Sequence, residues 1–488
     1  MIGMLLVGYF AARRVRDTAD FVVAGRRLPL WLATSTLLAT WMGAGTAMGA
    51  AGAAFESGLL GVIADPFGAA LCLLLAGMFF VRMMRRMRLL TIVDFFEIKY
   101  GDNVALIAAL ALIGVYVGWT GSQLVAFGFV LHSLTGISTS TGIVIATLIV
   151  LAYTTAGGMW AVSLTDFVQL LILSVGFALI LPLVLSDLGG WQRVSAAVPA
   201  GSFRIIPETA AWPQLLDYLR AWMVIGLGNI PAQDLMQRTL SSKNENVAQN
   251  ACYLAAIGYI TVGMIPVLLG IIGAVALPAI DNPEMIVPEL ALQHLHALPL
   301  TIFLGALLAA IMSSADSALL APASILGENI LPRLAPDLSP RAVLAITRFS
   351  VPVIGVASLA IALYAHNVYQ LFLDSFSLML VAMFVPLAAG IWWRQANRAA
   401  AAASMTAGVL VWLAGMPLLP GWPTDLFGLA AAALTFPAVA LASQRVDPPR
   451  PLRDDRGHPV SLRGRLGLLN PFDRHSRLAE DAATGYSP

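Results

Sequence analysis

The sequence is poor in charge and rich in apolar residues. Only 11% of its 488 residues are charged, and 59% belong to the hydrophobic set. A typical soluble domain has roughly 25% charged residues. The apolar stretches follow one another with too little polar sequence between them for a soluble module. This composition excludes most soluble classes and indicates an all-α integral membrane protein.

Cysteine, histidine and the common catalytic motifs are also scarce. Cys72 and Cys252 lie within apolar stretches, so they offer neither a disulfide framework nor a zinc site. The six histidines are scattered, and the sequence has no Walker-type glycine loop, no His-Glu-x-x-His and no Gly-x-Ser-x-Gly. We therefore expect no enzyme activity, no enzymatic cofactor and no transition metal. The net charge of +1 gives no reason to expect a nucleic-acid partner.

Roughly twelve or thirteen segments are apolar and about long enough to cross a bilayer core of ~30 Å as helices. The first, 1–11, is too short before Arg13 and Arg14 and lacks a small-residue cleavage site, so we interpret it as a truncated first helix and not as a signal peptide. The segments are 1–11, 29–53, 58–81, 104–134, 140–157, 160–188, 214–236, 248–278, 300–326, 342–365, 370–393, 399–418 and 424–443.

The basic residues predict the orientation of these spans. If the N-terminus is outside, almost all Lys and Arg fall in cytoplasmic loops, as the positive-inside rule requires. We therefore interpret the basic cluster 82–88 as a topological signal and expect a multi-pass plasma-membrane protein with a cytoplasmic C-terminus. The polar tail, 445–488, is expected to be disordered. The cytoplasmic basic residues are Arg13, Arg14, Arg16, Arg26, Arg27, Arg82, Arg85, Arg86, Arg88, Lys99, Arg238, Lys243, Arg333, Arg341, Arg394 and Arg398.

Two spans are interrupted by helix-breaking residues, at 39–45 and at 226–231. Matched interruptions in two halves are typical of a transporter site, because broken helices free backbone groups to bind ions and substrate. The alternative is that the glycines only allow close helix packing. Each half holds five spans, and an odd number gives opposite orientations, as an inverted repeat requires. The predicted divisions are 1–28, 29–188, an external loop 189–213, 214–393, two additional helices in 394–444, and the tail 445–488.

The ninth span carries adjacent hydroxyls that suit a small hard cation. Ser313 and Ser314, with the carbonyl of Ala310 one turn earlier, offer three oxygens on one part of a helix. If the first interruption exposes the carbonyls of Ala39 and Met42, a five-oxygen sodium cage follows. The alternative is that both serines only bond back to carbonyls of their own helix.

Several motifs then indicate a family. Gly25-Arg26-Arg27-Leu28-Pro29, Thr91-Ile92-Val93-Asp94-Phe95-Phe96, Gly157-Gly158-Met159-Trp160-Ala161-Val162 with Thr165, Asp166 and Gln169, Gln237-Arg238, and Ala310 through Ser317 occur in this order. In order and spacing they resemble the sodium:solute symporter family over nearly the whole chain. The resemblance implies a LeuT-like five-plus-five inverted repeat with broken helices.

The resemblance also implies roles for particular residues. It matches the family's sodium ligands to the carbonyls of Ala39, Met42 and Ala310 and the hydroxyls of Ser313 and Ser314. It also places Asp166 near the route by which sodium leaves inward. For Asp166 the alternative is an interfacial or capping acid.

Within the family, 39–43, 152–169 and 228–231 most resemble the high-affinity choline transporters. Aromatic faces bind quaternary ammonium groups well, and Trp41 and Trp119 match two positions of the choline cage. For Trp119 the alternative is packing or interfacial anchoring. Ala232 stands where those transporters have a third tryptophan and Ala69 where they have a tyrosine. The resulting space favours a solute bulkier than choline.

Two acidic residues are further candidates in the substrate region. Asp65 or Asp234 could supply a charge for an amine. Alternatively, Asp65 satisfies backbone groups that Pro66 frees, and Asp234 belongs to a gate or a loop contact.

The sequence therefore predicts a symporter that couples inward sodium flux to uptake of a small organic solute, best a quaternary ammonium or amine-type compound, by alternating access. Its expected partners are sodium, that solute and the lipid bilayer, and the oligomeric state is open. The alternatives are sodium- or proton-coupled uptake of an amino acid or carboxylate, and a membrane sensor with a transporter fold, although the tail is short for an output module. An intramembrane enzyme would need a catalytic dyad or metal ligands, and none is evident.

Overall fold

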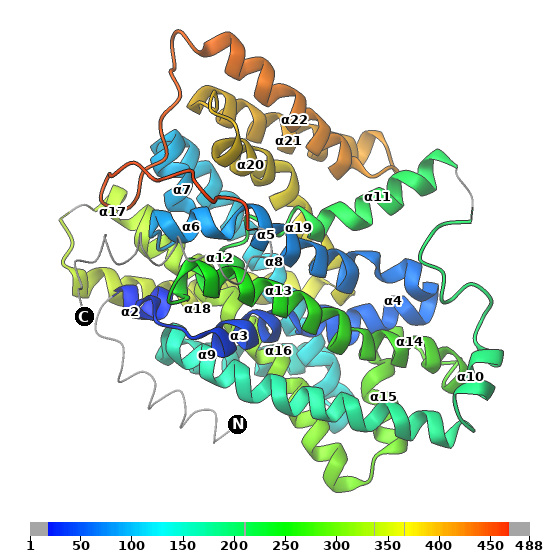
Figure 1. The fold of residues 1–488 in the computed structure, drawn as a ribbon. Helices are drawn as coiled ribbons and strands as arrows, with labels where there is room; N and C mark the ends of the chain where they lie inside the picture. The colour runs from blue at the N-terminus through cyan, green and yellow to red at the C-terminus, as the bar shows by residue number, and fades with distance from the viewer. Residues whose placement is uncertain (1–17, 209–210, 336, 366, 468–488) are drawn as a thin grey trace.

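The computed structural model describes residues 18–208, 211–335, 337–365 and 367–467, and all regular elements of these residues are helices (Figure 1). Within them, nine helical segments are long and apolar enough to cross a membrane. They are Gly45–Phe79, Asp102–Thr135, Val162–Asp187, Glu245–Ala276, Ala297–Leu334, Arg341–Tyr364, Val368–Trp392, Arg398–Leu418 and Thr424–Ser443.

Shorter or interrupted helices account for the other predicted spans in the described residues. α3 (Leu30–Trp41) begins the predicted second span, Thr139–Ala152 is a short apolar helix, and α11 (Trp212–Gly226) with α12 (Gln233–Ser241) forms the predicted seventh span. The prediction of an all-α membrane protein is confirmed. Segment 1–11 lies outside the described residues.

The predicted boundary between the fifth and sixth spans falls within one helical element. α9 runs from Thr139 to Asp187 and comprises 49 residues. At 1.5 Å per residue it would extend about 74 Å, more than twice a bilayer core of ~30 Å. Its apolar parts are separate, Thr139–Ala152 and Val162–Asp187. The element therefore holds enough helix for two crossings, whose division remains a prediction.

The break in the second span is confirmed. α3 ends at Trp41, and Met42 leaves helical geometry at φ −76° and ψ 40°. The chain continues as η2 (Gly45–Gly49) and α4 (Ala50–Ser57). A Cβ at Gly43 would lie 2.7 Å from Gln123 Oε1 and closer still to Ser314 Oγ. Glycine is thus required where the broken segment approaches two other helices.

The break in the seventh span is also confirmed. α11 ends at Gly226, and α12 begins at Gln233 after five turn residues and Ala232. Pro231 cannot donate a backbone hydrogen bond to a continuous helix. The two interruptions therefore occur where the sequence predicts them.

The two halves of the chain pack into each other. α3 contacts α9 of its own half, and α12, α13 and α16 of the other half. α16 (Ala297–Ile325) packs mainly against α9 and α8 (Asp102–Thr135). Figure 1 shows α3 beside α9, α13 (Glu245–Val262) and α16. The first break therefore lies against helices of the second half.

The remaining elements complete the bundle and its two ends. They are α2 (Thr18–Val23), η1 (Ala24–Arg26), η3 (Gly58–Val62), η4 (Ile63–Gly68), α5 (Ala69–Phe79), α6 (Val81–Met87), α7 (Ile92–Tyr100), α10 (Trp191–Ala197), α14 (Met264–Ala276), η5 (Pro283–Met285), α15 (Ile286–His294), η6 (Leu326–Ile330), α17 (Leu331–Leu334), α18 (Pro340–Tyr364), α19 (Val368–Met379), η7 (Leu380–Phe384), α20 (Val385–Trp392), α21 (Arg398–Leu418) and α22 (Thr424–Ser443).

The start of the polar tail is bound to the bundle. Gly467 donates its N–H to the Met78 carbonyl at 2.8 Å and accepts from Gln249 Nε2 at 3.0 Å. Arg86 Nη1 donates to the Ser461 carbonyl at 3.0 Å. The expectation of disorder is therefore wrong for 445–467, because its carbonyls find donors on α6 and α13. Residues 468–488 lie outside the described part of the chain.

The basic cluster 82–88 also has structural partners. Arg86 Nε lies 2.7 Å from Glu245 Oε1, and Arg82 Nη2 lies 3.4 Å from Glu245 Oε2. Arg82 also donates to Gln249 Oε1 at 2.9 Å. These contacts join α6 to the start of α13. The basic cluster therefore has a structural role besides the topological one that the sequence predicts.

Candidate functional site

The end of α3 and the middle of α16 meet inside the bundle. Ser314 Oγ donates to the Thr40 carbonyl at 2.7 Å, although the two residues are 274 positions apart. Ala39, Met42, Ala310 and Ser313 line one narrow pocket. The structure therefore brings four of the five predicted sodium ligands to the same pocket, with Ser314 next to them.

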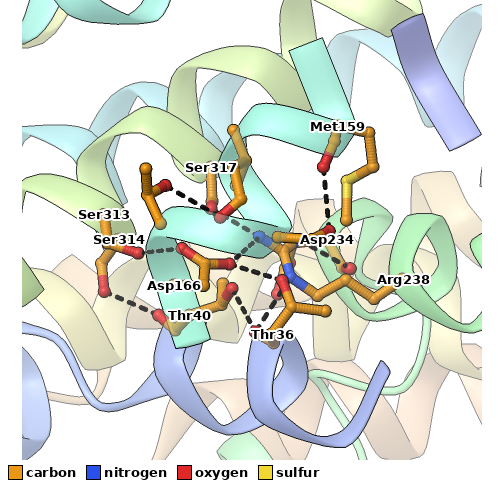
Figure 2. Close-up of polar contacts among 12 residues, drawn as sticks. Thr36, Thr40, Met159, Asp166, Asp234, Arg238, Ser313, Ser314 and Ser317 are labelled. Carbon is orange, nitrogen blue, oxygen red and sulfur yellow. Dashed lines mark hydrogen bonds and ion pairs between the residues drawn. The ribbon is translucent and has the colours of Figure 1, made fainter. Parts of the chain in front are cut away.

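The two serine hydroxyls keep their oxygens available for a cation. Ser313 donates its proton to Asp166, and Ser314 donates to Thr40 (Figure 2). A hydroxyl has one proton and two lone pairs, so donation to another helix leaves the lone pairs free. The alternative that these serines only bond back within α16 is wrong, because each donates to a different helix.

Asp166 is buried at the centre of this arrangement. Its carboxylate accepts hydrogen bonds from Ser313 and Thr36 and lies 3.8 Å from Arg238 Nη2. Its exposed fraction is 0%. The interfacial or capping alternative is wrong, because the carboxylate joins residues of α3, α12 and α16. Asp166 thus contacts the pocket through Ser313, which lines it.

Arg238 supplies the positive charge in the same cluster. Its Nη2 donates to Ser317 Oγ at 2.5 Å, its Nε to the Thr36 carbonyl at 3.2 Å and its Nη1 to the Asp234 carbonyl at 3.1 Å. A buried ion pair depends on such additional hydrogen bonds to offset its desolvation. Sequence reasoning identified the Gln237-Arg238 motif but missed this role, and it missed Thr36 entirely.

The predicted substrate residues lie beside this cluster. Trp41 Nε1 donates to Asp234 Oδ2 at 2.8 Å, and Tyr116 donates to Asp234 Oδ1 at 2.6 Å. Trp119 packs against Tyr116 with ring centroids 5.7 Å apart, and against Phe376 at 5.8 Å. Asp234 and Tyr116 thus connect the two predicted tryptophans. Asp234 is not a loop contact, because it lies in α12 and is fully buried.

The two alanines of the predicted cage are also buried. Ala69 is the first residue of α5, and Ala232 directly precedes α12. Their exposed fractions are 1% and 0%. Neither lines the pocket of the predicted sodium ligands.

Asp65 adds a second acidic centre near the first break. Its Oδ2 accepts from Thr46 at 2.5 Å, and Oδ1 has no hydrogen-bond partner among the described residues. The Trp41 carbonyl accepts from Tyr259 at 2.9 Å. The alternative that Asp65 satisfies backbone groups freed by Pro66 finds no support, because its carboxylate accepts from Thr46 in η2. Sequence reasoning missed Thr46, Tyr116 and Tyr259.

Two broken helices that meet at a buried polar site are typical of a secondary transporter. The family model for the sodium:solute symporter family matches residues 21–408. The chain belongs to that family and is a multi-pass membrane symporter that couples sodium to a small organic solute, and not an enzyme.

Comparisons with individual proteins agree with this assignment. High affinity choline transporter 1 of Homo sapiens is 30% identical over 471 residues, covering 90% of this chain and 81% of the relative. Osmoregulated proline transporter OpuE of Bacillus subtilis (strain 168) is 29% identical over 441 residues, covering 84% and 87%. The structure of a substrate-bound, outward-open Na⁺-coupled sialic acid symporter aligns with a TM-score of 0.75 at 22% identity, covering 90% of this chain and 96% of that one. This likeness confirms the LeuT-like fold.

Proposed function

We propose that this protein imports a quaternary ammonium or amine-type solute together with sodium, which enters down its gradient. The relatives named as choline transporters support an organic cation as the solute. Import then proceeds by alternating access, in which the two halves rock about a central site.

The proposed sodium site consists of the carbonyls of Ala39, Met42 and Ala310 and the hydroxyls of Ser313 and Ser314. Two observations support this site. Four of the five residues line one pocket, and both serines donate their hydroxyl protons to other helices. All five ligands are neutral, so sodium binds without a fixed counter-charge and can leave again. Asp166 lies beside the pocket and would attract the ion on its inward path.

The solute would lie near Trp41 and Trp119, with the small residues Ala69 and Ala232 leaving space around it. Aromatic faces attract a cation that cannot donate hydrogen bonds. The observation that carries the choice of a cation is Asp65, a buried carboxylate with one oxygen unpartnered and no basic partner among the described residues. A charge inside the membrane is costly and is usually functional. A cationic solute would supply the missing counter-charge.

The cellular location and orientation are part of the same proposal. A symporter driven by inward sodium flux belongs in the plasma membrane, with the C-terminal tail in the cytoplasm. The basic residues of the predicted cytoplasmic loops support this orientation.

Uptake into proteoliposomes tests the proposal. Purified protein is reconstituted, and radiolabelled choline and bulkier quaternary ammonium compounds are offered under a sodium gradient or a proton gradient. We expect uptake only under the sodium gradient, with competition by organic cations and not by proline or carboxylates. Uptake driven by protons alone would contradict sodium coupling, and competition by proline or a carboxylate alone would contradict the proposed solute class.

A further inference from the structure

One side chain of the proposed sodium pocket is polar, buried and without a partner. Gln169 on α9 lines the pocket together with Ala39, Met42, Ala310 and Ser313. Its exposed fraction is 1%, and neither its Oε1 nor its Nε2 has a hydrogen-bond partner in the described structure. Gln169 is not among the ligands that the family resemblance implies.

A buried side-chain amide without a hydrogen-bond partner is unusual in a folded protein. Native proteins leave few buried polar groups without a hydrogen bond, because each buried polar group without a partner destabilises the fold. The other α9 residues of the pocket wall are Leu170 and Leu173, whose side chains offer no polar partner. The missing partner must therefore come from the pocket itself.

The position of Gln169 on α9 fits this reasoning. Asp166 lies three residues earlier, and residues three apart lie on the same face of a helix. Asp166 already reaches Ser313 on α16 and Thr36 on α3. The same face of α9 therefore presents Gln169 to the gap between α3 and α16, one turn along from Asp166.

We propose that Gln169 Oε1 is a further oxygen ligand of the transported sodium ion. This inference rests on the proposed sodium site and adds a third helix to it. Amide oxygens are ordinary ligands of hard cations, and a neutral one leaves the charge balance of the site unchanged. Sodium would then connect α9 with the broken α3 and with α16, so that binding of the ion stabilises one arrangement of the three helices.

A control for Gln169 is available on α12. Gln237 is also a buried glutamine, with an exposed fraction of 1%, but its Nε2 donates to the Val22 carbonyl at 2.6 Å. It does not line the pocket. Gln169→Leu therefore removes an amide without a hydrogen-bond partner from the pocket. Gln237→Leu removes a hydrogen-bonded amide outside the pocket.

Sodium titrations of purified protein test the proposal, with thermal unfolding and direct ²²Na⁺ binding as the two readouts. In sodium-free buffer, Gln169→Leu should melt no lower than wild type, because it removes a buried amide that has no hydrogen-bond partner. Its sodium affinity should fall at least about tenfold. Gln237→Leu should melt lower and keep the wild-type sodium affinity. Gln169→Asn, with a shorter amide, should also bind sodium weakly, and it replaces the leucine variant if that variant does not fold.

Wild-type sodium affinity in both Gln169 variants would overturn the proposal. Ser313→Ala separates this failure from that of the sodium site itself. If Ser313→Ala loses sodium affinity while the Gln169 variants keep it, only the added ligand is wrong. If Ser313→Ala also keeps full affinity, the proposed site as a whole is wrong.

Discussion

Replacing Ser313 by alanine should weaken sodium binding, whereas a control variant that is destabilised by a similar amount should not. The substitution removes one proposed sodium ligand and the hydrogen bond to Asp166. A hydrogen bond to a charged group contributes roughly 1.5–3 kcal/mol net. We take the same range for a hydroxyl that binds sodium, and it corresponds to about a 10- to 150-fold change in affinity. The sodium concentration for half-maximal uptake should therefore rise at least about tenfold.

Ser317→Ala is the matched control. Ser317 lies four residues along the same helix and accepts a hydrogen bond from Arg238 at 2.5 Å, but it does not line the pocket. Its loss also removes a hydrogen bond to a charged group, so both variants should be destabilised by a similar amount. Only Ser313→Ala loses a sodium ligand.

The assay is sodium-dependent uptake in proteoliposomes, together with the melting temperature of each variant in detergent. We expect similar melting temperatures and a shift in half-maximal sodium of less than about threefold for Ser317→Ala. Equal sodium shifts in the two variants would refute the reasoning, because the effect would then follow from the shared hydrogen-bond loss. An unchanged sodium response in Ser313→Ala would refute the ligand assignment.

Three further variants probe the break, the solute charge and the tail. In Gly43→Ala the new methyl group would meet Gln123 Oε1 at 2.7 Å. Overpacking of about 1–3 kcal/mol should raise half-maximal sodium about 5- to 150-fold, and a wild-type titration would argue against close contact here. Asp65→Asn should raise the KM for a cationic solute about tenfold or more and leave half-maximal sodium unchanged, whereas an unaltered KM would remove Asp65 from the solute site. Deletion of residues 451–488 should lower the melting temperature, because the contacts of Gly467 with Gln249 are lost; an unchanged value would mean that the tail adds no stability.

The sequence was informative where the signal is local. Both breaks were predictable, because Gly43 and Pro231 disfavour a continuous helix at their own positions. The serine pair was visible as two adjacent hydroxyls in an apolar segment. Family resemblance, and not spacing alone, connected these hydroxyls to the carbonyls of a distant break.

The rest depends on contacts between residues far apart in the chain. Trp41 and Asp234 are 193 positions apart, and Tyr116 and Asp234 are 118 apart. No local pattern distinguishes Tyr116 from an ordinary aromatic residue of an apolar span. The polar composition of the tail likewise predicted disorder, because composition does not show that Arg86 would bind its carbonyls.

We expect a sodium ion to bind between the break of α3 and the hydroxyls of α16. Density maps of the protein prepared in sodium and in potassium, without organic cations in either buffer, would test this expectation. Sodium-dependent density should lie within about 2.6 Å of the oxygens of Ala39, Met42, Ala310, Ser313 and Ser314, by analogy with other hard cations. Identical maps at this position under the two conditions, or sodium-dependent density only elsewhere in the protein, would contradict it.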